Sequence, residues 1–526
     1  MASSSFEVAI VGAGPVGLTL ANLLGVHGVR TVVLERNPGT VEEPRAIAID
    51  AESLRTLQTA GLYEAVKDDM LLGFHVDYVN GRGQSLFDLD LDEAPYGHAL
   101  QNSFDQPTLE RQLHAGLERF EHVDIRFGHR IETLSQDDDV VRLGGQTDTG
   151  QPVAVDARYV VGCDGGRSTV RQQLGIEMNG TTAPQRWLVV DTVDPTLDDA
   201  LACRFYCDPS RPAMTLKKRH GKRRWEWMLL PDEHEGAFLE DARIHSLLAP
   251  HTDTKRITIE RKCVYTFHSI VADRYRDGRV LIAGDAAHMM PPFAGQGMNG
   301  GIRDARNLAW KLALVLRELA GDGLLDTYEV ERRDHVIAAT RLANQLGSFI
   351  QPTSRTRAFL RDAFFLAART LPFVRRSLEG MFAASLRAPR LPPGTFVAPA
   401  SPSAAPGAML PQPDVTLPDG RVARLDEILG PSFAIVGIDA DPAAALPAAS
   451  RAAWDRLGAR HVHLASASGT VPPAAARDHD DHLTRWLGGL HAPFLVVRPD
   501  KFVVAQFSAD GATAATRDAI ALLGTD

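Results

Sequence analysis

The chain has 526 residues, of which 44% are hydrophobic and 23% are charged, and its formal net charge is −10. A chain of this length predicts about three domains and a large buried core. The acidic balance disfavours a nucleic-acid-binding protein. The four cysteines are too few for a disulfide scaffold, and no apolar run reaches membrane-spanning length, so we expect a cytoplasmic protein.

The chain begins with a strand, a glycine-rich turn and a helix. Phe6 to Val11 predicts a buried strand, Gly12-Ala13-Gly14-Pro15-Val16-Gly17 follows it directly, and helical spacing runs from Pro15 to about Val26. Thr31 to Leu34 predicts a second strand, which ends in Glu35. This order predicts a dinucleotide site in which Gly12, Gly14 and Gly17 admit a pyrophosphate and Glu35 binds ribose hydroxyls. Taken alone, the pattern does not separate FAD from NAD.

Three further polar residues are candidates for the same site. Arg36 follows Glu35 directly, and Arg45 lies in a loop where a bidentate cation could bridge a pyrophosphate or reach a flavin edge. The alternative for Arg45 is an ordinary exposed loop arginine. Gln106 begins a helix that has Leu109, Leu113 and Leu117 on one face, and a solvated glutamine is nearly as plausible there as a cofactor contact.

Strand-like alternation appears in two separate stretches, residues 74–103 and 178–270. The second stretch contains the run Lys217 to Arg224, which would form a basic hairpin with His220-Gly221 at its tip. A solvated hairpin is the default, and attraction of nicotinamide phosphates is the sharper hypothesis. Trp225 and Trp227 share one strand face and would line either a substrate site or the sheet core. Cys203 and Cys207 lack a second ligand pair, so no metal site is expected.

Residues 279–316 carry the chemistry. Val280 to Ala283 predicts a buried strand that is closed by Gly284-Asp285, Pro291-Pro292 forces extended backbone, and helical spacing runs from Ile302. Glycines between the proline pair and this helix leave bare amides at the helix start, where a reduced flavin's negative charge would be stabilised. Asp285 suits a ribityl hydroxyl. No second strand–GxGxxG–helix occurs, so the two glycine segments together favour one FAD.

The motifs resemble those of the FAD-dependent aromatic hydroxylases of the p-hydroxybenzoate hydroxylase group. Gly284-Asp285-Ala286-Ala287-His288, Pro291-Pro292 and Gly295-Gln296-Gly297-Met298-Asn299 resemble the second FAD motif, and Asp164-Gly165 resembles the third. The resemblance implies that Asp164 lies near the pyrophosphate and that Gln106 contacts the ribityl chain. It also implies that Gly295, Gly297, Met298 and Asn299 hold the flavin.

The resemblance implies an α/β fold: a Rossmann-like FAD-binding domain, an inserted β-sheet substrate domain and a thioredoxin-like C-terminal domain. We expect the FAD-binding domain at 1–73, 104–177 and 271–352 and the substrate domain at 74–103 and 178–270. A helical segment follows at 353–390, a Pro/Ala/Ser-rich linker at 391–407, and the last domain, without cysteines, at 408–526.

The implied reaction is NAD(P)H reduction of FAD, formation of a flavin C4a-hydroperoxide with O₂, and oxygen transfer to a phenol. Pro292 would shape a dry pocket, and His75, Tyr265 and His288 are candidate bases, each as readily structural. Segments such as Trp187-Leu188-Val189-Val190-Asp191 and Glu331-Arg332-Arg333-Asp334-His335 resemble the 3-(3-hydroxyphenyl)propionate hydroxylases. A polycyclic polyketide hydroxylase, an FAD-dependent dehydrogenase and a non-catalytic flavin redox sensor remain alternatives, and a homodimer stays open.

Overall fold

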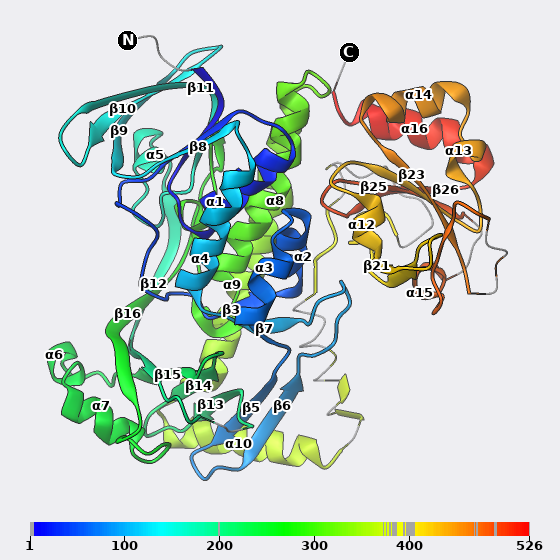
Figure 1. Cartoon of the computed structure of the whole chain (residues 1–526). Coiled ribbons are helices and arrows are strands. Elements are labelled where there is room, and N and C mark those ends of the chain that lie inside the picture. The colour runs from blue at the N-terminus through cyan, green and yellow to red at the C-terminus, as the bar shows by residue number, and fades with distance from the viewer. Residues whose placement is uncertain are drawn as a thin grey trace.

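The structure is a computed structural model of the chain. It describes residues 5–197, 200–371, 373–374, 376–377, 380, 387–392, 395, 405–467, 469, 472–488 and 492–524. Much of the linker expected at 391–407, and the end of the helical segment expected at 353–390, therefore lie outside the described residues. Three large sheets and the helices around them make up the described part (Figure 1).

The first sheet is the Rossmann-like part. Five of its eight strands are parallel, in the order β18, β11, β1, β2, β8, so their carboxyl ends share one edge, where ligands bind in such folds. Its strands are β1 (Ser5–Val11), β2 (Thr31–Leu34), β8 (Val123–Arg126), β9 (His129–Gln136), β10 (Val141–Thr147), β11 (Pro152–Gly162), β17 (Arg276–Asp277) and β18 (Val280–Ile282).

Helices connect and cover this sheet, and local sequence explains where they begin. Pro15 opens the first helix directly after Gly14, and the carboxylate of Asp50 caps the second by accepting a hydrogen bond from the Ser53 amide at 2.9 Å. The helices are α1 (Pro15–Val26), α2 (Ala51–Thr59), α3 (Tyr63–Val66), α4 (Gln106–Ala115), α5 (Thr169–Gln173), α8 (Gly297–Leu316) and α9 (Thr327–Ile350). Three short strands, β3 (Ala48–Asp50), β4 (Leu71–Leu72) and β7 (Gln101–Ser103), form a small separate sheet.

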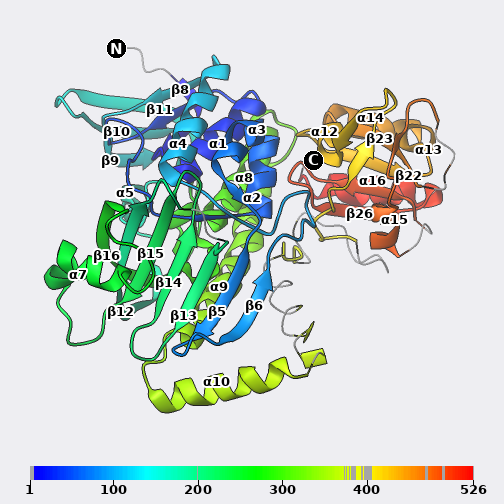
Figure 2. The ribbon, with the colours of Figure 1, turned by 60° about the horizontal axis from the view of Figure 1, so that its bottom comes forward.

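The second sheet lies below the first in Figure 1, and its strand order is β19-β16-β12-β15-β14-β13-β5-β6. Its strands are β5 (His75–Asn80), β6 (Ser85–Asp90), β12 (Met178–Val193), β13 (Cys203–Cys207), β14 (Ala213–Lys217), β15 (Lys222–Met228), β16 (Thr258–Ala272) and β19 (His288–Met289). Helices α6 (Glu235–Phe238) and α7 (Asp241–Leu248) pack on the face that carries Trp225 and Trp227. Helix α10 (Arg355–Arg369) runs along the lower edge in Figure 2.

The basic run in this sheet is less exposed than its sequence predicts. β14 and β15 do form a hairpin with His220 and Gly221 at its turn, both at positive φ. The expectation that the hairpin exposes its charges is wrong for three residues, which are buried: Lys218, Arg223 and Arg224. The partners of Lys218 and Arg224, described below, include Asp105 and Asp191, which are distant in sequence.

The C-terminal domain has a thioredoxin-like sheet, in which β22 and β23 are parallel, β25 pairs antiparallel with β22, and β26 pairs antiparallel with β25. Its strands are β20 (Asp414–Thr416), β21 (Val422–Arg424), β22 (Ala434–Ile438), β23 (Arg460–Ala465), β24 (Ala476–Arg477), β25 (Phe494–Val497) and β26 (Val503–Phe507). Its helices are α12 (Leu425–Leu429), α13 (Pro442–Ala445), α14 (Ala448–Arg456), α15 (His482–Leu487) and α16 (Ala512–Ala521). No helix in the described part of the chain is long and apolar enough to cross a membrane.

Candidate active site

A cavity of about 790 Å³ lies where the carboxyl end of the first sheet faces the second sheet. One wall comes from residues within 11–16, 34–48, 163–169 and 283–298. The other wall comes from β5, β6, β13, β14 and β15. A volume in this range suits a cofactor or small-molecule site. Among the described residues, no cluster of His, Cys, Asp or Glu is arranged to hold a metal ion.

The first glycine turn forms one end of the cavity. Gly12 has φ +106°, and a Cβ there would lie 2.5 Å from the carbonyl oxygen of Cys163. A Cβ at Gly17 would lie 2.0 Å from the Gly12 carbonyl oxygen, so Gly17 serves the packing of the turn and does not line the cavity. A Cβ at Gly14 would meet no atom within 4 Å. The start of α1 is therefore open to the cavity beside Gly14, as an anion site requires.

Glu35 ties the end of β2 to this turn. One oxygen of its carboxylate accepts a hydrogen bond from the Ala13 amide at 2.7 Å, and the other accepts from the backbone and side-chain nitrogens of Asn37 at 2.9 and 2.7 Å. Glu35 and Arg36 both line the cavity. Carboxylate lone pairs that remain beyond these bonds can accept ribose hydroxyls.

Arg45 and Gln106 meet on the same wall. The side-chain oxygen of Gln106 accepts hydrogen bonds from the amides of Arg45 and Ala46 at 3.0 and 2.6 Å, and its nitrogen donates to Glu110 at 2.7 Å. Gln106 thus fixes the backbone of the loop, while the exposed Arg45 side chain borders the cavity. The structure brings these two sequence-predicted residues together.

Asp164 lines the cavity beside the start of α5, whose N-cap residue is Ser168. Its carboxylate accepts hydrogen bonds from the Ser168 hydroxyl at 2.5 Å and from the Thr169 amide at 2.6 Å. Burial raises the pKa of the Asp164 carboxyl, and these hydrogen bonds oppose the rise. Arg171 donates to the carbonyls of Gly166 and Ala286, which joins this motif to the segment after β18.

The segment 285–299 contributes further lining residues to the cavity. Asp285 is open to the cavity, and its recessed position raises the pKa of its carboxyl, against the effect of His288 and Arg45. Pro292, Gly295, Gly297 and Met298 also line the cavity. At Gly297, the first residue of α8, a Cβ would meet no atom within 4 Å, so this helix start is open as well.

Asn299 braces this segment from behind. Its side-chain nitrogen donates to the Gly295 carbonyl at 2.5 Å and to the Ala48 carbonyl at 3.2 Å, while its oxygen accepts from the Asp50 amide at 3.1 Å and the Ser53 hydroxyl at 2.7 Å. Asn299 does not line the cavity. It joins the 295 turn to β3 and α2 and so shapes the cavity through the backbone.

The three candidate bases lie away from the cavity lining. His288 is fully buried, with its Nε2 2.7 Å from Asp304. The Tyr265 hydroxyl accepts a hydrogen bond from Arg261. His75 is exposed on β5, 3.4 Å from Asp88. The structure brings none of these three side chains together with Pro292.

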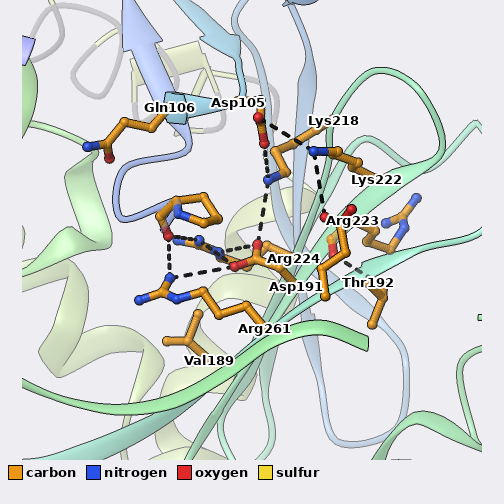
Figure 3. Close-up of polar contacts among 12 residues, drawn as sticks. Asp105, Gln106, Val189, Asp191, Thr192, Lys218, Lys222, Arg223, Arg224 and Arg261 are labelled. Carbon is orange, nitrogen blue, oxygen red and sulfur yellow. Dashed lines mark hydrogen bonds and ion pairs between the residues drawn. The ribbon is translucent and has the colours of Figure 1, made fainter. Parts of the chain in front are cut away.

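A buried ion network supports the second wall (Figure 3). Asp191 on β12 accepts hydrogen bonds from the Nε and Nη2 of Arg224 at 2.9 and 2.8 Å. Lys218 lies 3.0 Å from Asp105 and 3.6 Å from Asp191. Arg261 adds a third cation 3.7 Å from Asp191. These pairings explain why the basic run is buried.

The same network grips the Arg45 loop from its carbonyl side. Arg224 donates from Nη1 to the Arg45 carbonyl at 2.6 Å and from Nη2 to the Pro44 carbonyl at 2.5 Å. Arg261 also donates to the Pro44 carbonyl. The loop is therefore held by Gln106 at its amides and by the second sheet at its carbonyls.

The rest of the second wall is apolar apart from one carboxyl. Its larger apolar side chains include Phe74, Val76, Tyr78, Phe205 and Leu216. Glu226 is the acidic residue that the described part of this wall contributes, and it is 6% exposed. Asp191, Arg261 and Glu226 were missed from the sequence. Alternation along β15 places Arg224 and Glu226 on one face, but it does not say which face borders a cavity.

Comparison with known proteins identifies the fold. The family model described as FAD binding domain matches residues 5–343, and the HcaD C-terminal domain matches residues 407–522. The chain is 42% identical over 522 residues to a 3-(3-hydroxy-phenyl)propionate/3-hydroxycinnamic acid hydroxylase of Burkholderia cenocepacia (strain HI2424), which covers 97% of this chain and 95% of that protein.

Solved structures agree. The flavin-dependent monooxygenase PieE, in complex with FAD and substrate, superposes with a TM-score of 0.79 at 22% identity, over 99% of this chain and 100% of that one. The p-nitrophenol 4-monooxygenase PnpA from Pseudomonas putida DLL-E4 gives a TM-score of 0.67 at 28% identity, over 74% and 100%. The expected fold class is confirmed, as are the FAD cofactor and NAD(P)H as reductant. The chain belongs to the FAD-dependent aromatic monooxygenases and is an enzyme of that family.

Proposed function

We propose that the enzyme hydroxylates a phenol that carries a short carboxylate side chain, such as 3-(3-hydroxyphenyl)propionate, with NAD(P)H and O₂. The observation that carries this proposal is the 42% identity to a named hydroxylase of such substrates across 97% of the chain. The predominantly apolar second wall of the cavity supports it, since an aromatic ring needs such a surface.

The residues present fit FAD. Two open helix starts, at Gly14 and Gly297, face the cavity, one suited to a pyrophosphate and the other to the charge of a reduced flavin. We assign ribose hydroxyls to Glu35, the pyrophosphate region to Arg45 and Asp164, and the ribityl chain to Asp285. Gly12, Gly17 and Asn299 act through backbone shape.

FAD, when bound, takes electrons from NAD(P)H and delivers one oxygen atom of O₂ to an electron-rich ring. The chain's own contribution is to orient the ring and to keep water out. Pro292 and Phe293 close the cavity between the open helix start and the apolar wall. A dry site suppresses hydrolytic side reactions.

The test is NAD(P)H and O₂ consumption with a panel of phenols, read together with product mass. We expect 3-(3-hydroxyphenyl)propionate to stimulate NAD(P)H oxidation and to gain one oxygen atom. Hydroxylation of polycyclic phenols alone would transfer the assignment to polyketide substrates. Substrate oxidation without oxygen insertion would indicate a dehydrogenase, and FAD binding without any turnover would indicate a redox sensor.

We also propose a cytoplasmic location and a homodimer. A cytoplasmic location is supported by the dependence on NAD(P)H and by the free thiols of Cys163, Cys203, Cys207 and Cys263. A homodimer is supported by apolar side chains on the outer face of α10, where Phe359, Leu360 and Phe364 are 69, 62 and 59% exposed. Light scattering of the purified protein measures the oligomeric state, and a monomer would exclude the dimer.

A further inference from the structure

Glu226 occupies an unusual position in the cavity. It shares a face of β15 with Arg224, while Trp225 and Trp227 stack on each other at 6.0 Å on the opposite face, packed with α6 and α7. The Glu226 side chain therefore faces the cavity, on a wall whose other lining residues, apart from Arg224, are predominantly apolar. A buried carboxyl in such surroundings normally has a hydrogen-bond partner.

Glu226 and its neighbour Arg224 both have unused hydrogen-bonding capacity. No described residue forms a hydrogen bond with the Glu226 carboxyl. Of the five N–H groups of Arg224, four are engaged by Asp191, Pro44 and Arg45, which leaves one on Nη1 without an acceptor among the described residues. Nη1 lies 4.0 Å from the Glu226 Oε1, too far for a direct hydrogen bond.

The 4.0 Å space between Arg224 Nη1 and Glu226 Oε1 favours one kind of ligand group. An oxygen about 2.8 Å from both atoms would bridge them, accepting from Arg224 and donating to Glu226. A hydroxyl does both, whereas an ether cannot donate and a carboxylate would repel the ionised Glu226. The ring hydroxyl of a phenol therefore matches the pair better than its carboxylate end.

We propose that Glu226 is the catalytic base that removes the proton from the ring hydroxyl of the substrate, while Arg224 holds the oxygen. The inference rests on the proposed function. The O–H bond breaks, the proton binds Oε1 of Glu226, and the electron pair stays on the ring oxygen. The Glu226 carboxylate becomes a neutral acid, and the phenolate oxygen continues to accept a hydrogen bond from the N–H of Arg224. Added electron density at the ortho and para carbons favours oxygen transfer to the ring.

The electrostatics around Glu226 suit this role. Burial raises the pKa of Glu226 to about 7; Arg224 on its own strand and Arg261 on β16 oppose the rise, and Asp191 on β12 adds to it. The neighbouring thiols of Cys203 and Cys263 have raised pKa values, chiefly through burial, so they stay neutral. The raised pKa of Glu226 brings it closer to that of a free phenol, about 10, which eases proton transfer near neutral pH.

The kinetic test uses the FAD-loaded full chain and Glu226→Gln, which keeps the shape but accepts no proton at this pH. We expect kcat with 3-(3-hydroxyphenyl)propionate to fall by about 100-fold and the acid limb of kcat/KM near pH 7 to disappear. Glu260→Gln, which removes an exposed carboxylate from β16, should keep both. A Glu226→Gln enzyme that retains the acid limb and a kcat within about three-fold of wild type would overturn the inference.

A binding test needs no turnover. The flavin absorbance change, without NAD(P)H, gives Kd for 3-(3-hydroxyphenyl)propionate and for its methyl ether. We expect wild type to prefer the hydroxyl compound by about 10-fold or more, Glu226→Gln to keep part of this preference because its amide oxygen still accepts, and Glu226→Leu to lose it. A Leu variant with normal FAD content and full preference would overturn the inference. A wild type that neither binds nor hydroxylates any phenol would instead overturn the proposed function.

Discussion

Two of the buried clusters of charge in the described part of the chain differ in whether their carboxylates have hydrogen-bond partners. Beneath the cavity, Asp191 lies close to Arg224, Lys218 and Arg261, yet the Glu226 carboxyl, 4.0 Å from Arg224, accepts no hydrogen bond from a described residue. Between α9 and the C-terminal domain, both carboxylate oxygens of Glu331 and both of Asp500 accept hydrogen bonds from Arg498. Carboxylates that are fully hydrogen-bonded suit a structural contact between domains, whereas a buried carboxyl without a hydrogen-bond partner suits a site that receives a ligand.

The contact between domains is built around Glu331 on α9. Arg498 donates to both of its oxygens at 2.7 and 2.8 Å, and Lys311 donates at 2.9 Å. Asp500 takes two further hydrogen bonds from Arg498, at 2.9 and 2.6 Å. Burial alone would raise the pKa of Glu331, but Arg498 and Lys311 outweigh burial and hold it far below its usual range. Burial lowers the pKa of Lys311 to about 8 despite Glu331.

The largest expected effect is the loss of stability when Glu331 is replaced. Glu331→Gln leaves Arg498 and Lys311 without their shared anion, so we expect the free energy of unfolding to fall by about 3–5 kcal/mol. Urea unfolding of the full chain measures this loss. Asp334→Asn removes an exposed carboxylate from the same helix and should change little. Equal free energies of unfolding for the two variants would show that the contacts of Glu331 do not stabilise the fold.

Replacement of Glu226, in the cluster beneath the cavity, should stabilise the folded chain, whereas replacement of Glu331 destabilises it. The pKa of Glu226 is about 7 in the folded chain and 4.5 without burial, so wild type loses stability relative to Glu226→Gln as pH rises from 4.5 through 7. The difference should vanish below pH 4.5 and level off above pH 7, with the variant more stable by about 3 kcal/mol. Thermal unfolding of the substrate-free enzyme at several pH values checks this. A variant less stable than wild type at pH 8 contradicts it.

A smaller effect is expected for Asp285→Ala. The carboxylate is open to the cavity, and its loss removes a hydrogen-bond acceptor for the ribityl chain, so we expect FAD affinity to fall by about 10- to 100-fold. Equilibrium dialysis of the apoprotein with FAD measures the change. Asp273→Ala, at an exposed position before β18, is the control. Full retention of FAD by Asp285→Ala would remove this residue from the cofactor site.

The smallest effect is expected at the tip of the basic hairpin. Because Lys218, Arg223 and Arg224 are buried, attraction of nicotinamide phosphates falls mainly to Arg219, which is exposed and screened by salt. We expect Arg219→Ala to raise the KM for NAD(P)H by about two-fold at low ionic strength. Steady-state kinetics at two salt concentrations test this, and an unchanged KM ends the steering hypothesis.

Local patterns predicted local structure well. α1 and β2 have the bounds that their sequence periodicity indicates, because each is specified by its own apolar spacing. The start of α8 at Gly297 was not visible in the apolar pattern, which begins at Ile302, since glycines give no periodic signal. Burial of Lys218 and Arg224 depends on Asp105 and Asp191, which lie on distant segments. No reading of residues 217–224 alone could find those partners.

The candidate site divides in the same way. Residues next to a glycine turn, such as Gly14, Glu35 and Asp285, were found because turn chemistry is written in consecutive residues. Glu226 has no motif around it. Its chemistry arises only when β15 is placed opposite the 285–299 segment, which is a tertiary event.

The buried contacts between the last domain and the rest of the chain also limit how this protein can be recombined. Arg55 on α2 binds Asp426 through two hydrogen bonds of 2.7 Å and donates to the Leu410 carbonyl, entirely out of contact with water. A chimaera joined near residue 407 would strand Arg55 and Glu331 unless the incoming domain supplied an acid and an arginine at the matching places. The last domain therefore cannot be exchanged freely between related proteins, and we expect its contact residues to change together with those of the catalytic half.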